Sequence, residues 1–228
     1  MKYVQFVDVP QLVIGLGSIL AGANALKTGI SGSSGQLAEN KFSAVKLPLS
    51  ALNKKGYKTQ IHPAGNIDNR VRYIVKTIQK GRTDPRVRAF AVQAVSRKCG
   101  KKWCVPERDW WGEARAVFGA IRENVRYVRD IHNVDTFQAP GRTLEFGGAD
   151  CDDYTITLGS ALQSIGFPIK VRIVQSVDSP DYNHVFALVG LPPRDPHGWY
   201  AMDASVNKPA GWHPPKAMLK KIKDYDVP

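Results

Sequence analysis

Apolar residues recur at helical spacing in three separate stretches of the sequence. The first stretch covers residues 67–78 and ends at Gly81. The second starts at Asp84-Pro85, where a capping residue precedes a proline in the first helical position. The third covers residues 107–125. Because each pattern leaves one apolar side, we predict three helices that pack on a common core.

The pattern changes after residue 125. Residues 126–130 are short enough to be extended, and residues 135–146 are typical of a loop. A further helix is predicted for residues 151–165, with a stop at Gly166. Apolar and polar residues then alternate, or apolar runs are bounded by turn residues, in three predicted strands at residues 169–177, 184–189 and 199–204. Helices followed by an antiparallel meander indicate an α+β fold.

The chain divides by composition into three predicted parts. We predict an apolar arm with a Gly/Ser linker at residues 1–40, a basic helical extension at 41–105, and a further domain at 106–228 that contains the candidate chemistry described below. The apolar run at 12–26 is shorter than the about 20 residues that cross a bilayer, so a stable membrane span is not expected. An arm that packs on a partner protein is the first interpretation, ahead of a signal peptide or a membrane anchor.

The formal net charge is +12, and much of it lies between residues 68 and 130, where 16 Lys or Arg face 7 Asp or Glu. Such a surface suits nucleic acid, an anionic cell-wall polymer or an acidic protein. The alternative is a set of solvated helix faces, and the helical spacing of these charges favours it. Nucleic acid is therefore not the expected partner.

The sequence contains three cysteines, too few for a disulfide framework. Cys99 and Cys104 can pair with each other or stay free. They supply only half of a zinc site, since such a site needs about four ligands. We expect neither a metal nor a cofactor.

Cys151 is the candidate nucleophile. It lies in the run GGADCDDY, directly before the predicted helix, and Asp150 is suited to cap that helix. The N-terminus of a helix favours a thiolate and lowers the pKa of the thiol, whereas carboxylates pointing at the sulfur act in the opposite direction. His184 follows 33 residues later and Asp203 another 19 after that. A thiol, an imidazole and a carboxylate in this order suggest a nucleophile, a base and an orienting acid.

The predicted strands provide a way to bring His184 and Asp203 together. If the strands at 184–189 and 199–204 pair as a hairpin, the two side chains become cross-strand neighbours. Asp203 then accepts from one imidazole nitrogen while the other faces Cys151. Each residue also has a simpler interpretation: a structural histidine that satisfies a backbone carbonyl, and an aspartate that caps a turn.

These residues resemble a known family. The runs GGADCDDYTITLGSALQSIGFPIKVRIV, NHVFALV and GWYAMDAS are similar to the transglutaminase-like superfamily, whose fold is related to that of papain-type cysteine proteases. The resemblance covers residues 107–206, and the chain is similar to small bacterial and bacteriophage-encoded members. It implies Cys151 as nucleophile, His184 as base and Asp203 as orienting acid, with Gln138 as an oxyanion donor beside the Cys151 backbone N–H. Ala149 stands where the family usually has glycine.

The resemblance implies a reaction that proceeds through a thioester on the cysteine. Water as acceptor gives amide hydrolysis of a protein or peptide, by a protease or amidase, and this is the expected function. A lysine amine as acceptor gives a transglutaminase cross-link instead. A further alternative is a structural minor virion protein that keeps the fold and meets its partners through residues 1–40. A phage virion or the bacterial host cytoplasm is the expected location, with the cell envelope as another possibility.

Overall fold

The computed structural model describes residues 66–130 and 136–228. The predictions made for residues 1–40, and the first part of the predicted extension up to residue 65, lie outside the described residues. Within the described ranges, no helix combines the length and apolar character needed to cross a membrane.

The predicted helices at 67–78, after Asp84, and at 107–125 are all confirmed. Asn66, Asp84 and Asp109 cap the first three helices, and each side chain accepts a hydrogen bond from a backbone N–H in the first turn. Together with two later ones, the helices are α2 (Ile67–Gly81), α3 (Pro85–Val95), α4 (Trp110–Asn124), α5 (Pro140–Phe146) and α6 (Cys151–Ser164).

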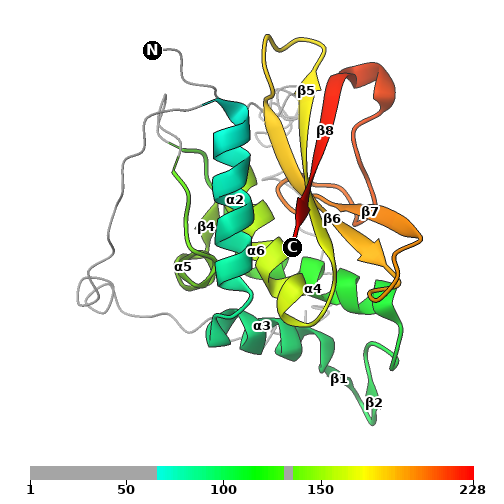
Figure 1. Ribbon diagram of the computed structural model, residues 1–228. Coiled ribbons are helices and arrows are strands. Elements are labelled where there is room, and N and C mark those ends of the chain that lie inside the picture. The colour runs from blue at the N-terminus through cyan, green and yellow to red at the C-terminus, as the bar shows by residue number, and fades with distance from the viewer. Residues whose placement is uncertain (1–65, 131–135) are drawn as a thin grey trace, which may run out of the picture.

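Helix α6 forms the centre of the molecule. Its residues from Cys151 to Leu162 are all buried. The other helices pack around it on one side, and the sheet covers another side (Figure 1). A helix that is buried on every side has no polar face, so the polar side chains in its first turn must find partners inside the protein.

The sheet contains four antiparallel strands in the order β7-β6-β5-β8. Their bounds are β5 (Ile169–Ser176), β6 (His184–Leu191), β7 (Gly198–Met202) and β8 (Leu219–Val227). The predicted meander of three strands is confirmed as β5, β6 and β7. Strand β8 was not predicted; it follows the short 3₁₀ helix η2 (Lys216–Met218) and pairs along β5. The sequence pattern hides it because an edge strand exposes most of its side chains, as β8 does.

The loop prediction for residues 135–146 was wrong in its second half, which forms α5. Proline starts this helix at Pro140, and Gly147 ends it in the left-handed conformation at φ 71°. Two very short strands follow from this arrangement: β3 (Arg126–Tyr127) pairs in parallel with β4 (Gly148–Ala149). This pairing fixes the chain immediately before α6.

Cys99 and Cys104 form a disulfide, which decides between the two alternatives that the sequence left open. The bridge closes a small hairpin of β1 (Lys98–Cys99) and β2 (Lys102–Trp103). Cys151 is the free cysteine of the described residues and is buried.

Helix α2 joins the helical layer to the sheet. Val71, Ile74 and Ile78 belong to the same buried core as α6 and β5. On its other side, Asp68 accepts hydrogen bonds from the Lys223 ammonium, at 2.6 Å, and from the Tyr225 hydroxyl of β8. One core therefore crosses the boundary that the sequence suggests between residues 105 and 106, and that boundary stays a prediction.

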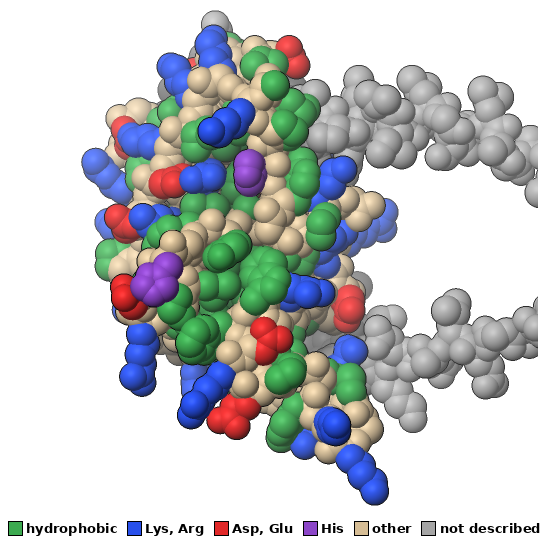
Figure 2. Space-filling model, turned by 90° about the vertical axis from the view of Figure 1, so that its right-hand side faces the viewer, with side chains coloured by type: hydrophobic (Ala, Val, Ile, Leu, Met, Phe, Trp, Pro, Cys, Tyr) green, Lys and Arg blue, Asp and Glu red, His purple; other side chains and the backbone are tan. Residues whose placement is uncertain are grey.

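The basic charge is distributed over the surface. Figure 2 shows Lys and Arg side chains scattered over one face of the molecule around hydrophobic groups, without a continuous basic stripe. Several cations are paired with carboxylates: Arg86 with Asp84, and Arg172 with Asp224, where the guanidinium makes two hydrogen bonds of 2.7 Å. This distribution agrees with the interpretation of solvated helix and strand faces.

Candidate active site

Cys151 is the first residue of α6, as expected from the sequence. Its side chain is buried, and the preceding Asp150 caps the helix by accepting from the Asp153 N–H at 3.2 Å. The Thr155 hydroxyl lies 2.7 Å from the Cys151 carbonyl oxygen and 3.2 Å from that of Val185. This hydroxyl therefore connects the first turn of α6 to the start of β6.

His184 and Asp203 are in direct contact. The His184 Nε2 lies 2.6 Å from Asp203 Oδ2, and the Asp203 side chain is only 2% exposed. The second carboxylate oxygen, Oδ1, accepts from the Ser205 hydroxyl at 2.7 Å and from the Ser205 N–H at 3.2 Å. With both oxygens held, Asp203 fixes the orientation of the imidazole ring.

The predicted hairpin pairing is present, although its register is not the one that would put these two residues opposite each other. The last pair in the β6–β7 ladder is Ala187 with Met202. Both His184 and Asp203 therefore lie beyond the paired part of the hairpin, and their side chains bridge the gap.

The thiol of Cys151 lies near this pair. The backbone N–H of Val185, the residue after His184, donates a hydrogen bond to the sulfur, and the charge of Asp203 acts on the thiol. The fold thus gathers Cys151, His184 and Asp203 where the N-terminus of α6 meets the start of β6.

The electrostatic surroundings of the sulfur differ from the expectation. Burial raises the pKa of the Cys151 thiol well above its usual value, and the negative charges of Asp150, Asp152 and Asp203 raise it further. The Val185 hydrogen bond acts in the opposite direction but does not compensate. The pKa of the thiol is therefore raised and not lowered as expected, with burial as the largest cause and the neighbouring carboxylates next.

The carboxyl groups beside Cys151 are themselves crowded. Burial, together with the charge of Asp150, raises the pKa of Asp152 well above its usual range and the pKa of Asp153 to about 8. Burial likewise raises the pKa of Asp130. Oxygens of Asp150, Asp152 and Asp153 lie within 4.8 Å of one another, a spacing that could admit a cation. We assign no metal there, because these groups already accept hydrogen bonds from protein N–H groups.

Gln138 makes hydrogen bonds that the sequence did not predict. Its side-chain Nε2 donates to Asp153 Oδ2 at 2.6 Å and to the Gly148 carbonyl at 3.3 Å, and its backbone N–H donates to Asp153 Oδ1 at 2.6 Å. The side-chain amide is thus engaged by Asp153 and Gly148, and in this geometry Gln138 holds Asp153. Its role as an oxyanion donor stays a prediction.

One comparison with known proteins matches the segment that contains this site. Residues 103–204 match the family model described as the transglutaminase-like superfamily, and Cys151, His184 and Asp203 all lie inside this range. Residues 103–204 form a transglutaminase-like domain. The helices α2 and α3 and the strand β8 lie outside the matched range.

Solved structures that resemble the chain have low sequence identity. A candidate cysteine protease from Cytophaga hutchinsonii is 15% identical, with a TM-score of 0.44, and the match covers 72% of this chain and 50% of that one. A TGase is 14% identical, with a TM-score of 0.38, and the match covers 73% and 38% of the two chains. Legionella pneumophila LapG, EGTA-treated, is 18% identical, with a TM-score of 0.37, over 61% and 73%. The chain thus spans half the length of the Cytophaga protein. No curated protein matches the sequence.

Three residues around the transglutaminase-like domain's site were missed from sequence. Thr155 and Ser205 give no signal of their own, because hydroxyl residues occur everywhere. Arg70 does give one: it lies three residues after Ile67 and four before Ile74, so a charge stands on the apolar side of a helix. In the structure this arginine is half-buried beside Asp152.

Proposed function

We propose that this protein is a cysteine-dependent amide hydrolase, a protease or amidase, with Cys151 as nucleophile, His184 as base and Asp203 as the acid that orients the histidine. The observation that carries the proposal is the 2.6 Å contact between His184 Nε2 and Asp203 Oδ2, made next to a buried thiol at the start of a helix. The family match over residues 103–204 supports the same chemistry.

The raised pKa of Cys151 means that the resting site holds a neutral thiol. The proton must then leave the sulfur as the sulfur attacks the carbonyl carbon of the amide, and His184 is the base that takes it. Because Nε2 is directed to Asp203, the transfer uses Nδ1. Asp203 stabilises the imidazolium that results.

The same proton completes the first half of the reaction. The C–N bond of the amide breaks, the imidazolium gives its proton to the leaving amine, and the acyl group remains on sulfur as a thioester. Water then attacks the thioester as His184 removes its proton, which releases a carboxylic acid and restores the thiol. The backbone N–H of Cys151, at the first helical position, has no acceptor within the helix and supplies a donor for the oxyanion.

An amine in place of water would give a cross-link from the same thioester. A role as a minor virion component would use the chain without chemistry, through the segment at 1–40. The substrate of the proposed hydrolase is a protein or peptide.

The first test measures thiol reactivity without any substrate. With the Cys99–Cys104 bridge intact, iodoacetamide labels Cys151 among the described cysteines. We expect His184→Ala to slow this labelling at pH 7.5 by at least about tenfold, because the base is lost. Equal labelling rates in the wild type and in His184→Ala would contradict the proposal. The matched control is His197→Ala, since His197 is also near a strand but outside the site.

The second test identifies the acyl acceptor. Casein incubated with the protein in ¹⁸O-water and a dansylated alkylamine gives ¹⁸O-labelled new carboxylates if water is the acceptor. Fluorescent casein without ¹⁸O-labelled products would mean that the amine is the acceptor, and the protein would be a transglutaminase. Cys151→Ala must abolish whichever product is observed.

A further inference from the structure

The hairpin of β1 and β2 lies at the edge of the molecule, below the helices in Figure 1. Its strands connect α3 to α4, and the Cys99–Cys104 disulfide closes it. No residue from 97 to 109 belongs to the buried core, and residues 97–103 are all exposed. The hairpin therefore adds nothing to the packing of the core, and its side chains face solvent.

The shape of the hairpin is nevertheless well defined. Lys98 pairs with Trp103 across the two strands, and the Cys104 N–H donates to the Arg97 carbonyl at 2.9 Å. Gly100 turns the chain in the left-handed conformation at φ 67°. Because the backbone is fixed by these bonds and by the disulfide, the exposed side chains are presented in a preorganised arrangement, which lowers the entropy lost on binding.

The hairpin is strongly basic. Residues 97–104 (RKCGKKWC) contain the cations Arg97, Lys98, Lys101 and Lys102 and no carboxylate. Among the ion pairs of the described residues, none includes any of these four side chains. Their charges are therefore not neutralised by carboxylates of the described part of the protein, and they attract an anionic partner.

A tryptophan stands among these cations. The Trp103 side chain is 52% exposed, and the Lys98 ammonium lies 3.1 Å from the centre of its ring. Trp110, the first residue of α4, is also exposed. An indole combines a large apolar surface with one polar N–H, and such rings are enriched at the boundary between water and lipid.

The arrangement favours a bilayer over a nucleic acid as the anionic partner. The face in Figure 2 has no continuous basic stripe, whereas a nucleic acid is bound by cations that follow its backbone. The Lys98 ammonium covers one face of the Trp103 ring, which closes that face to a stacked base. Disulfides also persist best outside the reducing cytosol. A membrane surface that carries anionic lipid agrees with all three observations.

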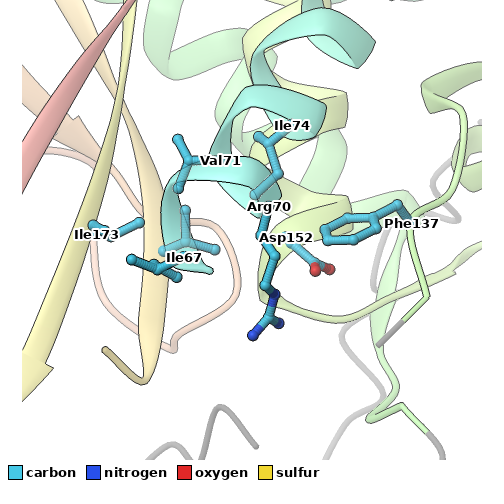
Figure 3. Close-up of a pocket in the computed structure, with 8 residues that line it drawn as sticks. Ile67, Arg70, Val71, Ile74, Phe137, Asp152 and Ile173 are labelled. Carbon is cyan, nitrogen blue, oxygen red and sulfur yellow. The ribbon is translucent and has the colours of Figure 1, made fainter. Parts of the chain in front are cut away.

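The hairpin is separate from the candidate active site. A small pocket beside Cys151 opens between α2, the start of α6 and the sheet (Figure 3). Its lining comes from α2, α6, β5 and β6 together with Phe137, and no residue of the hairpin contributes to it. Docking through the hairpin therefore does not use this pocket.

We propose that the β1–β2 hairpin is a docking surface for an anionic lipid bilayer, in which the four cations bind the headgroups and Trp103 enters the headgroup region. The contact is reversible and needs no membrane span. This docking does not depend on the chemistry proposed for Cys151.

The test is co-sedimentation of the full chain with vesicles in about 0.1 M NaCl. We expect binding to vesicles of equal parts phosphatidylglycerol and phosphatidylcholine, and at least about tenfold weaker binding to pure phosphatidylcholine, which lacks the negative charge. Raising the salt to about 0.5 M should release most of the protein, since salt screens exposed charges. Equal binding to both kinds of vesicle, or binding to neither, would overturn the proposal.

A charge reversal assigns the binding to the hairpin. Lys101→Glu/Lys102→Glu should weaken binding to the anionic vesicles by at least about tenfold, because two attractive charges become repulsive. The matched control is Lys220→Glu/Lys221→Glu, which makes the same change at two consecutive exposed lysines of β8 and should retain most of the binding. Equal losses in both variants would mean that net charge alone drives the binding, and the hairpin would not be the docking surface.

Removal of the indole distinguishes a bilayer from a soluble polyanion. Trp103→Ala should weaken vesicle binding by at least about fivefold, because the ring no longer enters the headgroup region. Phe146→Ala removes a ring that is similarly exposed, at the end of α5, and should bind like the wild type.

Fluorescence anisotropy then measures binding to labelled single-stranded DNA and to labelled heparin. Binding to either one as tight as to the vesicles, and unaffected by Trp103→Ala, would overturn the proposal in favour of a soluble polyanion. Circular dichroism checks the fold of each variant, and the comparison of the two kinds of vesicle needs only the wild type. Cys151→Ala should bind vesicles like the wild type, so a failure of the proposed hydrolase would leave the docking result unchanged.

Discussion

Two groups of charged residues stand at the N-termini of two helices, and they have opposite properties. At the start of α3, Asp84 caps the helix and pairs with Arg86, whose guanidinium also contacts Glu145. The hydrogen bond from Arg86 lowers the pKa of Asp84. At the start of α6, burial raises the pKa values of Asp152 and Asp153.

The difference comes from the surroundings and not from the residue type. The Asp84 side chain is partly buried, which disfavours its charged form, but the hydrogen bond from the largely exposed Arg86 outweighs this burial and lowers the pKa. The group at α6 is buried and its members repel one another, so the charged forms are penalised. An ion pair such as Asp84–Arg86 joins neighbouring surface residues. Buried carboxyl groups with raised pKa values, such as those at the start of α6, are typical of reactive sites.

The largest effect is expected from Cys151→Ala. Amide hydrolysis should fall by at least about 10³-fold, because the nucleophile is removed. The free energy of unfolding, measured in urea, should change by about 1 kcal/mol or less, since only one small buried atom is lost. Arg86→Ala at the other helix is the control and should retain full hydrolysis. Hydrolysis by Cys151→Ala at the wild-type rate would mean that the start of α6 is not a reactive site and does not differ in this respect from the start of α3.

Asp203→Asn is expected to have the next largest effect. The amide cannot stabilise the imidazolium and favours the wrong tautomer of His184, so hydrolysis should fall by roughly 10²- to 10⁴-fold. Steady-state rates should show the loss mainly in kcat. Asp181→Asn, on an exposed turn, is the control. An effect confined to KM would indicate that Asp203 serves substrate binding and does not orient His184.

The stability of the protein should decrease as pH rises from 5 to 8. The folded-state pKa of Asp153 is about 8, above the value of about 3.9 in an unfolded chain, and the pKa values of Asp130 and Asp152 are raised as well. The folded state therefore binds more protons than the unfolded state in this range, which makes the slope negative, with about 1.4 kcal/mol per pH unit for each proton. Urea unfolding at pH 5 and pH 8 should differ by roughly 2 kcal/mol or more.

Asp153→Asn, which cannot ionise, should flatten this slope, and Asp181→Asn should not. A stability that rises between pH 5 and pH 8 would mean that the carboxyls at α6 behave like Asp84, whose pKa is lowered.

The smallest effect is expected from Arg86→Ala. An exposed ion pair contributes about 0.5–1 kcal/mol, so the free energy of unfolding should fall by that amount and the alkylation rate of Cys151 should not change. High salt should reduce the difference between Arg86→Ala and the wild type, because salt screens exposed charges. A slower alkylation of Cys151 in Arg86→Ala would mean that the charged residues at the start of α3 influence the thiol at the start of α6, contrary to this prediction.

Helices and strands whose apolar residues recur at regular spacing could be predicted from sequence, and elements without such a pattern could not. The stripes of α2 and α4 and the cap at Asp150 were found because helical spacing and capping are local properties. Strand β8 (LKKIKDYDV) is mostly charged and becomes a strand through its pairing with β5, which is not a local property. Helix α5 has only seven residues, too few to show a period.

The site follows the same rule. Sequence order and motif predicted Cys151, His184 and Asp203, and the fold brings them together. The pKa of the thiol could not be predicted, because it depends on how deeply α6 is buried and on where the neighbouring carboxylates point. The partner of Gln138 was missed for the same reason: only the folded chain places its amide beside Asp153.

The bonds from Asp68 to Lys223 and Tyr225 join residues 155 and 157 positions apart along the chain. Closing so long a loop costs conformational entropy, and the contacts that offset this cost form only when β8 has paired with the sheet. We therefore expect α2 to dock late in folding. A fragment trimmed to residues 103–204 would lack α2 and β8, leaving one flank of α6 and the hydrogen-bonding edge of β5 open to solvent. The smallest piece of this chain worth expressing for chemistry therefore runs from α2 to β8.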